Sequence, residues 1–157
     1  MIIYLLSVLI VMLLLYHFFI WKPLDTSVLY KNHPYLLFGH RGSPLHEPEN
    51  TIASFKRAIA DGCNAIELDV HRTRDGHLVV FHDDTLERTS NGTGRVAEHT
   101  LAELQVLNAA IEWEGREERI PLLQEVVAAL PESTIFNFEI KNFSFFSEQR
   151  TELELIR

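Results

Sequence analysis

Cysteine is nearly absent from this chain, because Cys63 is the only one among 157 residues. An intrachain disulfide and a thiolate zinc cluster are therefore excluded, and Cys63 is expected to be a buried structural thiol. Basic residues are also scarce, with 14 Lys and Arg against 22 Asp and Glu. The formal net charge of −8 argues against a nucleic-acid partner, which needs a basic stripe. Phosphate substrates stay open, because a bound divalent cation reverses the local field.

Lys, Arg, Asp and Glu are missing from the first 21 residues, and the run from Ile2 to Trp21 is almost wholly apolar. At ~1.5 Å per residue, about 20 helical residues span the ~30 Å hydrocarbon core of a bilayer. No basic region precedes the run and no small-residue cleavage site follows it. We therefore favour a transmembrane helix at residues 1–21 over a secretory signal peptide or a buried helix. This predicts a membrane protein with a single-pass N-terminal anchor, whose side of the membrane is undetermined.

Residues 22–35 contain two prolines and mixed polarity, which predicts a linker. Beyond the linker, short apolar runs alternate with helical patterns. Strands are expected at residues 36–39, 65–70, 78–81 and 135–140. Helices are expected after a cap at Asn50 or Thr51, after Thr100, from Pro121 and at residues 147–157. Such alternation predicts an α/β fold with parallel strands and outer helices. The fully apolar run at 78–81 is typical of a buried parallel strand, and a long polar loop is expected from Asp84 to Thr100.

Polar groups capable of chemistry lie inside or directly after each expected strand. In a parallel barrel all strand C-termini open on one face, which carries the active site. The pattern therefore predicts one site that combines His40, Arg41, Glu67, Asp69, His82, Glu139 and Lys141.

The three carboxylates indicate a metal site. Glu67 and Asp69 are two residues apart on one strand, so their side chains emerge on the same face, with Cα atoms ~6.5–7 Å apart. Two such anions repel each other unless a cation bridges them. With Glu139, they offer oxygen ligands and no sulfur, a set that suits Mg²⁺ or Ca²⁺, with Mn²⁺ also acceptable, better than zinc.

The histidines and cations complete a phosphoester-hydrolysing site. His40 and His82 each end an apolar run, and imidazoles can accept and donate protons near neutral pH. One would activate the attacking oxygen and the other would protonate the departing alcohol. Arg41 and Lys141 can hold a phosphate group, Arg41 through two parallel hydrogen bonds.

The ordered motifs resemble those of the glycerophosphodiester phosphodiesterase family. They cover most of the chain after the apolar segment, from about Phe38 to Lys141. They are His40-Arg41-Gly42, Pro48-Glu49-Asn50-Thr51, Glu67-Leu68-Asp69-Val70, Thr73-Arg74-Asp75-Gly76, His82-Asp83, Asn91-Gly92-Thr93-Gly94 and Glu139-Ile140-Lys141.

The resemblance implies a TIM-type (β/α)8 barrel, a divalent metal, and hydrolysis of glycerophosphodiesters to sn-glycerol 3-phosphate and an alcohol. By motif match, His40 and His82 resemble the acid/base pair, and Arg41 and Lys141 the phosphate contacts. The matching metal ligands are Glu67, Asp69 and Glu139. Glu49 and Asn50 resemble supporting residues around the site.

The chain is short for such a barrel, which needs eight strands and ~250 residues. Only four strands are expected here, so residues 36–157 are predicted to be the first half of the barrel, a fragment whose own activity is left open. The apolar N-terminal run is similar to that of family members that act on lysophospholipids as lysophospholipase D enzymes.

Three alternatives stay open. The first is lysophospholipase D-type hydrolysis of a lysophospholipid, and the second is a membrane-anchored, non-catalytic module that kept the fold. The third is a TIM-type phosphodiesterase that cleaves phosphoinositides. The Glu67-x-Asp69 pair and the Asn-Gly-Thr-Gly loop favour the glycerophosphodiester branch by resemblance.

Overall fold

The computed structural model describes residues 1–19, 27 and 34–141. The chain divides into two compact units, Met1–Pro34 and Tyr35–Arg157. Most of the expected linker at 22–35 and the expected helix at 147–157 lie outside the described residues.

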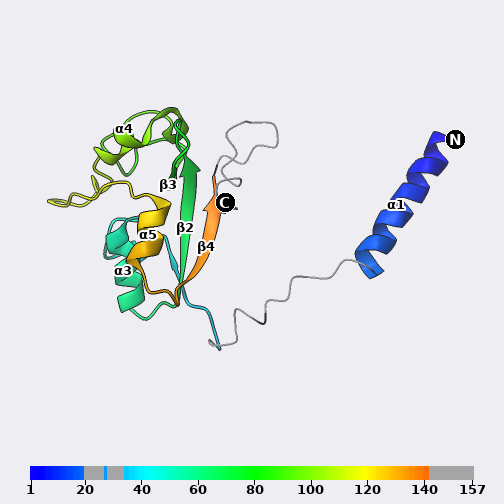
Figure 1. The fold of residues 1–157 in the computed structure, drawn as a ribbon, viewed down its shortest axis with the longest axis horizontal. Helices are drawn as coiled ribbons and strands as arrows, with labels where there is room; N and C mark the ends of the chain where they lie inside the picture. The colour runs from blue at the N-terminus through cyan, green and yellow to red at the C-terminus, as the bar shows by residue number, and fades with distance from the viewer. Residues whose placement is uncertain (20–26, 28–33, 142–157) are drawn as a thin grey trace. The chain divides into compact units, whose positions relative to one another are not determined.

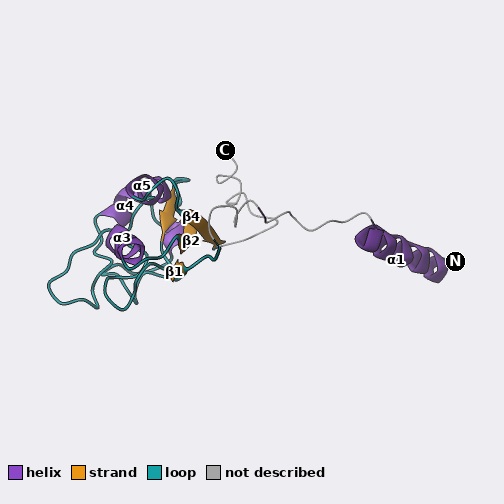
Figure 2. Ribbon diagram, turned by 90° about the horizontal axis from the view of Figure 1, so that it is seen from below, coloured by secondary structure: helices purple, strands orange, loops and turns teal. Residues whose placement is uncertain are grey.

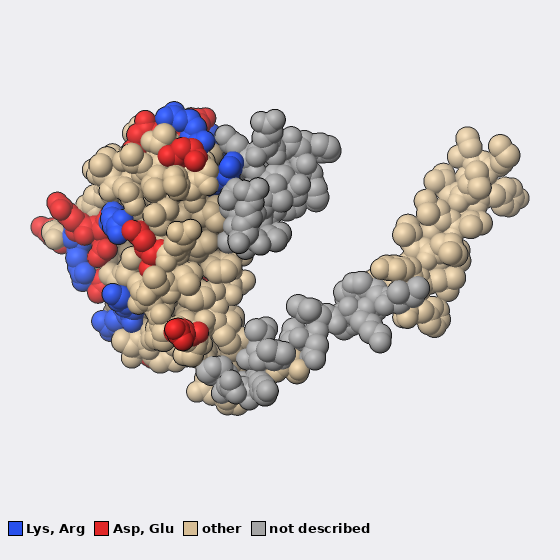
Figure 3. Space-filling view, in the orientation of Figure 1, with Lys and Arg blue, Asp and Glu red and all other residues tan. Residues whose placement is uncertain are grey.

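The first unit contains helix α1, Ile2–Phe19. Its described large hydrophobic side chains are all exposed, from 46% at Leu15 to 80% at Phe18, and Figure 3 shows no charged side chain on its visible surface. The expected helix is therefore present. Its role as a transmembrane anchor is not supported, because no helix among the described residues combines the length and apolarity needed to cross a membrane.

The second unit is built on a four-stranded sheet with β2, Ala65–Arg72, at its centre. Strand β4, Ile135–Ile140, runs parallel to β2 along one edge, from the Ala65–Ile135 pair to the Val70–Ile140 pair. The other edge of β2 is shared by two three-residue strands. Strand β1, Phe38–His40, is parallel to its first half, and β3, Leu78–Val80, pairs with its second half.

Strand β3 is antiparallel to β2, so the prediction of a parallel strand at 78–81 is wrong. The reason is the length of the connection. Only five residues, 73–77, separate the two strands, whereas a parallel crossover needs about a dozen or more. They form a tight turn in which Gly76, at φ 92°, donates its backbone N–H to the carbonyl of Thr73.

The antiparallel course of β3 makes β1 and β3 point toward each other along the same edge of β2. β1 ends at His40, which lies opposite Glu67. Just beyond β3, Phe81 donates its backbone N–H to the carbonyl of Asp69. The C-terminal ends of both short strands therefore meet beside residues 67–69 of β2.

Helices α3, Ile52–Ala60, and α5, Leu123–Ala129, cover one face of the sheet (Figures 1 and 2). Every second residue of β2 faces these helices and joins a buried core. The core consists of Phe55, Ala58, Ile66, Leu68, Val70, Val80, Leu123, Val126 and Leu130. The opposite face of β2 is thereby left for its polar residues.

The helix expected after Asn50 or Thr51 and the helix expected after Thr100 are both present, with Thr51 and Thr100 as their caps. The Thr51 side chain caps α3 by accepting from the backbone N–H of Ser54. Thr100 and Glu103 form a reciprocal capping box on α4, Leu101–Gln105. Such caps satisfy the free N–H groups of a helix's first turn.

The segment between β3 and α5 contains more structure than a polar loop. Besides α4, which is the helix expected after Thr100, it holds the short helix η1, Val96–Glu98. Leu86 and Val96 are fully buried in a second hydrophobic cluster, which also includes Val79 of β3. The expected Asp84–Thr100 loop is thus packed against the sheet by its own small core.

Candidate active site

The alternation of β2 separates its core-facing residues from its polar ones. Ile66, Leu68 and Val70 pack under the helices, so Glu67 and Asp69 emerge on the other face, as period-two geometry requires. Both acids are nonetheless buried, at 8% and 0% exposure. Buried carboxylates are costly unless they find partners, so their neighbours decide what the site can do.

The three predicted metal ligands do converge. One carboxylate oxygen each of Glu67, Asp69 and Glu139 lies within 4.8 Å of the other two. Glu139 reaches Asp69 because these residues are register partners on the parallel strands β4 and β2. Burial, together with the nearby Asp69 carboxylate, raises the pKa of Glu67.

This donor set fits a divalent metal. Glu67 Oε1 is buried and has no hydrogen-bond partner, so it has a lone pair to offer. Three carboxylates with no sulfur or imidazole form a hard oxygen site of the kind that Mg²⁺, Ca²⁺ and Mn²⁺ use.

Asn50 and Arg41 hold Asp69 from the loop that follows β1. Asn50 Nδ2 donates to Asp69 Oδ2 at 2.8 Å, and Arg41 Nε lies 3.5 Å from the same oxygen. Both residues adopt left-handed backbone, with φ 57° and 56°, and the Asn50 N–H donates to the Arg41 carbonyl. The backbone hydrogen bond closes this loop and brings both side chains to the carboxylate.

Lys141 approaches the same carboxylates from the end of β4. Its Nζ lies 3.0 Å from Asp69 Oδ1 and contacts Glu139 Oε1. Burial lowers the pKa of Lys141, but its contacts with Glu139 and Asp69 outweigh burial and raise it. Lys141 therefore stays a cation at the edge of the acidic cluster.

His40 lies directly beside the cluster and is accessible. Its Nε2 is 3.7 Å from Glu67 Oε2, and its side chain is 68% exposed. The next residue, Arg41, donates its backbone N–H to Glu67 Oε2 at 3.1 Å. An exposed imidazole next to the carboxylates is open to a substrate.

His82 is linked to the cluster through other charged residues. Its Nδ1 contacts Asp83 Oδ1. Arg88 donates two hydrogen bonds to the same carboxylate, from Nε to Oδ2 at 2.6 Å and from Nη2 to Oδ1 at 2.9 Å. Arg88 Nη2 also donates to Glu49 Oε1 at 2.7 Å, and Glu49 pairs with Arg41 at 3.2 Å.

Arg88 was missed by the sequence reasoning. It follows His82 by six residues, inside a segment interpreted only as a loop. Its two-sided contact depends on Glu49, which is 39 residues away in the chain. Arg88 is recognisable only from its contacts with the carboxylates of Asp83 and Glu49. The sequence pattern does not show that these two carboxylates lie close together.

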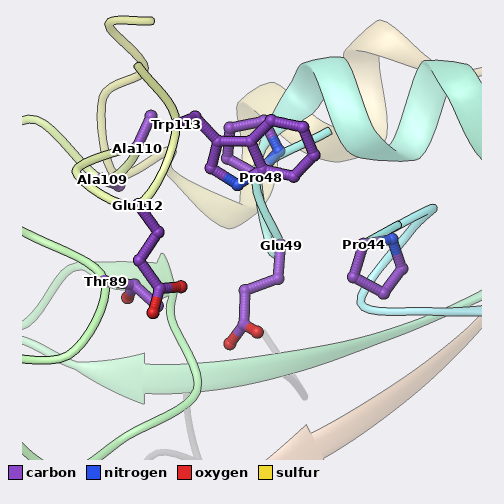
Figure 4. Close-up of a pocket in the computed structure, with 8 residues that line it drawn as sticks. All are labelled: Pro44, Pro48, Glu49, Thr89, Ala109, Ala110, Glu112 and Trp113. Atoms are coloured by element: carbon purple, nitrogen blue, oxygen red, sulfur yellow. The ribbon is translucent and has the colours of Figure 1, made fainter. Parts of the chain in front are cut away.

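A small pocket adjoins Glu49 (Figure 4). Its other walls come from the loop after β1 and from the segment between β3 and α5, including the Trp113 ring and the Glu112 carboxylate. It is lined by Pro44, Pro48, Glu49, Thr89, Ala109, Ala110, Glu112 and Trp113. The pocket places an aromatic ring next to one of the predicted supporting residues.

Comparison with known proteins identifies the class. The sequence profile of the Glycerophosphoryl diester phosphodiesterase family matches residues 40–154, and the chain belongs to this family. It is 48% identical over 110 residues to a glycerophosphodiester phosphodiesterase of Caldanaerobacter subterraneus, covering 68% of this chain and 45% of that protein. It is 38% identical over 107 residues to human glycerophosphodiester phosphodiesterase 1, covering 65% and 32%.

Solved structures agree with this assignment. An Oleispira antarctica phosphodiesterase in complex with the product sn-glycerol-3-phosphate has 39% sequence identity and a TM-score of 0.63, covering 68% of this chain and 44% of that one. A glycerophosphodiester phosphodiesterase from Agrobacterium tumefaciens has 36% identity and a TM-score of 0.64, covering 67% and 46%. The chain thus spans between about a third and just under half of the length of these relatives, which agrees with part of a barrel.

Proposed function

We propose that the protein of which this chain forms at least a part hydrolyses glycerophosphodiesters to sn-glycerol 3-phosphate and an alcohol. The observation that carries the proposal is the convergence of Glu67, Asp69 and Glu139, with an oxygen of each inside a 4.8 Å cluster. Family membership supports the reaction class, and the product bound to the Oleispira relative supports the glycerol 3-phosphate half of the substrate.

In this proposal the three carboxylates hold a divalent ion, Mg²⁺ or Ca²⁺ with Mn²⁺ also acceptable. Such an ion supplies charge neutralisation at the phosphoryl oxygens. Arg41 and Lys141 bind the phosphate group as permanent cations. Their placement on both sides of Asp69 supports this role.

His40 and His82 exchange the protons. One takes the proton of the attacking oxygen, and the other gives a proton to the departing alcohol. The support for His40 is its exposed position beside Glu67. Asn50 and Glu49 act as supporting residues, since they contact Asp69 and Arg41 respectively.

The test combines ion binding with hydrolysis and uses the complete protein that contains this chain. Mn²⁺ binding is followed by electron paramagnetic resonance, and sn-glycerol 3-phosphate release is measured from glycerophosphocholine. Glu67→Gln is expected to abolish both, because it removes an anionic ligand. The matched control, Glu132→Gln, changes an exposed acid in the turn before β4 and is expected to leave both intact.

The outcomes separate the alternatives. Mn²⁺ binding without hydrolysis would favour the non-catalytic module, and normal hydrolysis by Glu67→Gln would overturn the metal-ligand assignment. His40→Ala and His82→Ala are each expected to slow hydrolysis at least ~100-fold, the usual scale of acid–base catalysis. An unchanged rate would remove that histidine from the mechanism.

A lysophospholipid is a second candidate substrate, and the exposed apolar helix α1 is the observation that favours it. We propose that α1 attaches the protein to a lipid bilayer, where such substrates reside. Flotation with phosphatidylcholine vesicles, compared between the whole chain and residues 35–157, tests the attachment. Choline release from lysophosphatidylcholine tests the substrate. Equal flotation of both chains would overturn the attachment.

A further inference from the structure

Two charged residues outside the predicted site lie between His82 and the phosphate-contacting Arg41. Asp83 contacts the Nδ1 atom of His82, and Arg88 holds both oxygens of Asp83. The same guanidinium donates to Glu49, which pairs with Arg41. The side chains of Asp83 and Arg88 are 26% and 39% exposed, so solvent only partly screens the connection.

The contact between Asp83 and His82 has a defined proton position. Arg88, more than any other group, holds the pKa of the Asp83 carboxyl far below its usual range, so this carboxyl is ionised and can only accept. The proton of the contact therefore belongs to His82 Nδ1. In a neutral ring, Nε2 then carries the free lone pair.

We infer that Asp83 and Arg88 are positioning residues that lock His82 as its Nδ1–H tautomer, with Nε2 left to exchange protons with the substrate. Asp83 selects the tautomer and Arg88 fixes the Asp83 carboxylate with a two-pronged contact, which is more directional than a single ion pair. Only one part of this inference, that Nε2 exchanges protons with a substrate, rests on the proposed function.

The geometry also explains the need for arginine. Three acceptor contacts meet one side chain: Arg88 Nε to Asp83 Oδ2, and Nη2 to both Asp83 Oδ1 and Glu49 Oε1. A planar guanidinium presents these donors in a fixed fork, which a lysine ammonium cannot do. Arg88 thereby ties the orientation of His82 to the loop that carries Glu49 and Arg41.

The test reads the tautomer directly in the 157-residue chain. Long-range ¹⁵N–¹H NMR spectra distinguish a protonated Nδ1 from a protonated Nε2, at a pH where the ring is neutral. The His82 signals are assigned by their absence in His82→Gln. In the wild-type protein, the Nδ1–H tautomer of His82 is expected to outnumber the Nε2–H tautomer at least about tenfold, given the usual strength of a charge-assisted hydrogen bond.

Two variants remove the lock in different ways. Asp83→Asn places an amide where both carboxylate oxygens accept, and Arg88→Gln removes the fork while leaving Asp83. Asp83→Asn is expected to lose most of the Nδ1–H preference, because it removes the ionised acceptor. Arg88→Gln is expected to lose only part of it, because Asp83 can still accept from Nδ1–H but is no longer held in place. The matched control is Arg95→Gln, which removes an exposed arginine 3.7 Å from Asp84 and is expected to leave the His82 tautomer unchanged.

The wild-type spectrum decides the inference even if a variant fails to fold. A predominantly Nε2–H ring in the wild type would overturn it, as would an unchanged tautomer preference in folded Asp83→Asn. An unchanged preference in folded Arg88→Gln would overturn the positioning role of Arg88. Hydrolysis is measured separately, on the complete protein that contains this chain. An Nδ1–H ring without hydrolysis would count against the proposed function alone, whereas hydrolysis with an Nε2–H ring would count against the lock alone.

Discussion

At the scale of single residues, Asp69 is the point where the site's contacts converge. Its side chain is 1% exposed, and its carboxylate oxygens lie 2.8 Å from Asn50 Nδ2, 3.0 Å from Lys141 Nζ and 3.5 Å from Arg41 Nε. Removing one partner of a buried charge is costly, because the charge that remains keeps its desolvation penalty. The burial of the Asp69 carboxylate is therefore tolerated only because residues distant in the sequence contact it.

Replacing Asn50 separates its hydrogen bond from its backbone conformation. Asn50→Gly tolerates the left-handed φ of 57° but loses the bond to Asp69, and is expected to lower the unfolding free energy by about 1–3 kcal/mol. Asn50→Ala is expected to lose about 1–2 kcal/mol more, because it also strains the backbone. Urea denaturation measures both, and equal losses would refute the backbone contribution.

The Glu49 carboxyl predicts an acid dependence of stability. Burial raises the pKa of Glu49, but its contacts with Arg88 and Arg41 outweigh burial and lower it. Because the folded pKa is below the unfolded one, ionised Glu49 stabilises the protein above the unfolded pKa of about 4.5. This contribution is lost as pH falls through the folded pKa. Glu49→Gln is expected to reduce the slope of the unfolding free energy against pH between about pH 5 and 3. The exposed control Glu132→Gln should change this slope less. An unchanged slope in Glu49→Gln would contradict the pairing.

At the scale of elements, β1 reaches the site because it packs very closely on α3. A Cβ on Gly39 would lie 2.7 Å from Ala58 Cβ and 2.9 Å from the Gly42 carbonyl oxygen. Gly39 therefore lets β1 lie against the helix while its neighbour His40 lies opposite Glu67. The glycine requirement arises from packing between two elements, since no positive φ is involved at this position.

Gly39→Ala is expected to lower the unfolding free energy by about 1–3 kcal/mol, the usual cost of overpacking. Ala58→Gly should relieve part of the clash, so the double variant should be more stable than the two single effects added together predict. A double-mutant cycle by urea denaturation measures this coupling. Strict additivity would show that Ala58 is not what limits the approach of β1.

At the scale of the whole molecule, the described strands form one partial sheet, with α3 and α5 on one face (Figure 2). The acidic cluster emerges on the other face, because the alternate residues of β2 pack under the helices. The cluster draws on β2 and β4, whose residues 67 and 139 are far apart in the chain. An ion would therefore bind at this cluster only in the folded state, because unfolding separates β2 from β4. Ion binding and folding of the second unit should therefore be thermodynamically linked.

A divalent cation is expected to raise the melting temperature of the chain, and a chelator should reverse the rise. At a cation concentration 100 times its Kd, the stabilisation is about 2.7 kcal/mol. Calorimetry with Mn²⁺ measures the shift, and Glu67→Gln should remove most of it while Glu132→Gln keeps it. No shift in the wild type would contradict the metal site.

The sequence by itself determined where the strands lie, that one helix begins at Asn50 or Thr51 and another at Thr100, and which residues are candidate ligands. Period-two alternation and capping patterns are local, so they can be read along the chain. The tertiary structure decided that β3 runs antiparallel, that β1 and β3 meet beside residues 67–69, and that Arg88 bridges Asp83 and Glu49. These features depend on contacts between residues that are far apart in the chain. Strand direction and packing decide which residues meet, and no pattern within a single segment shows them.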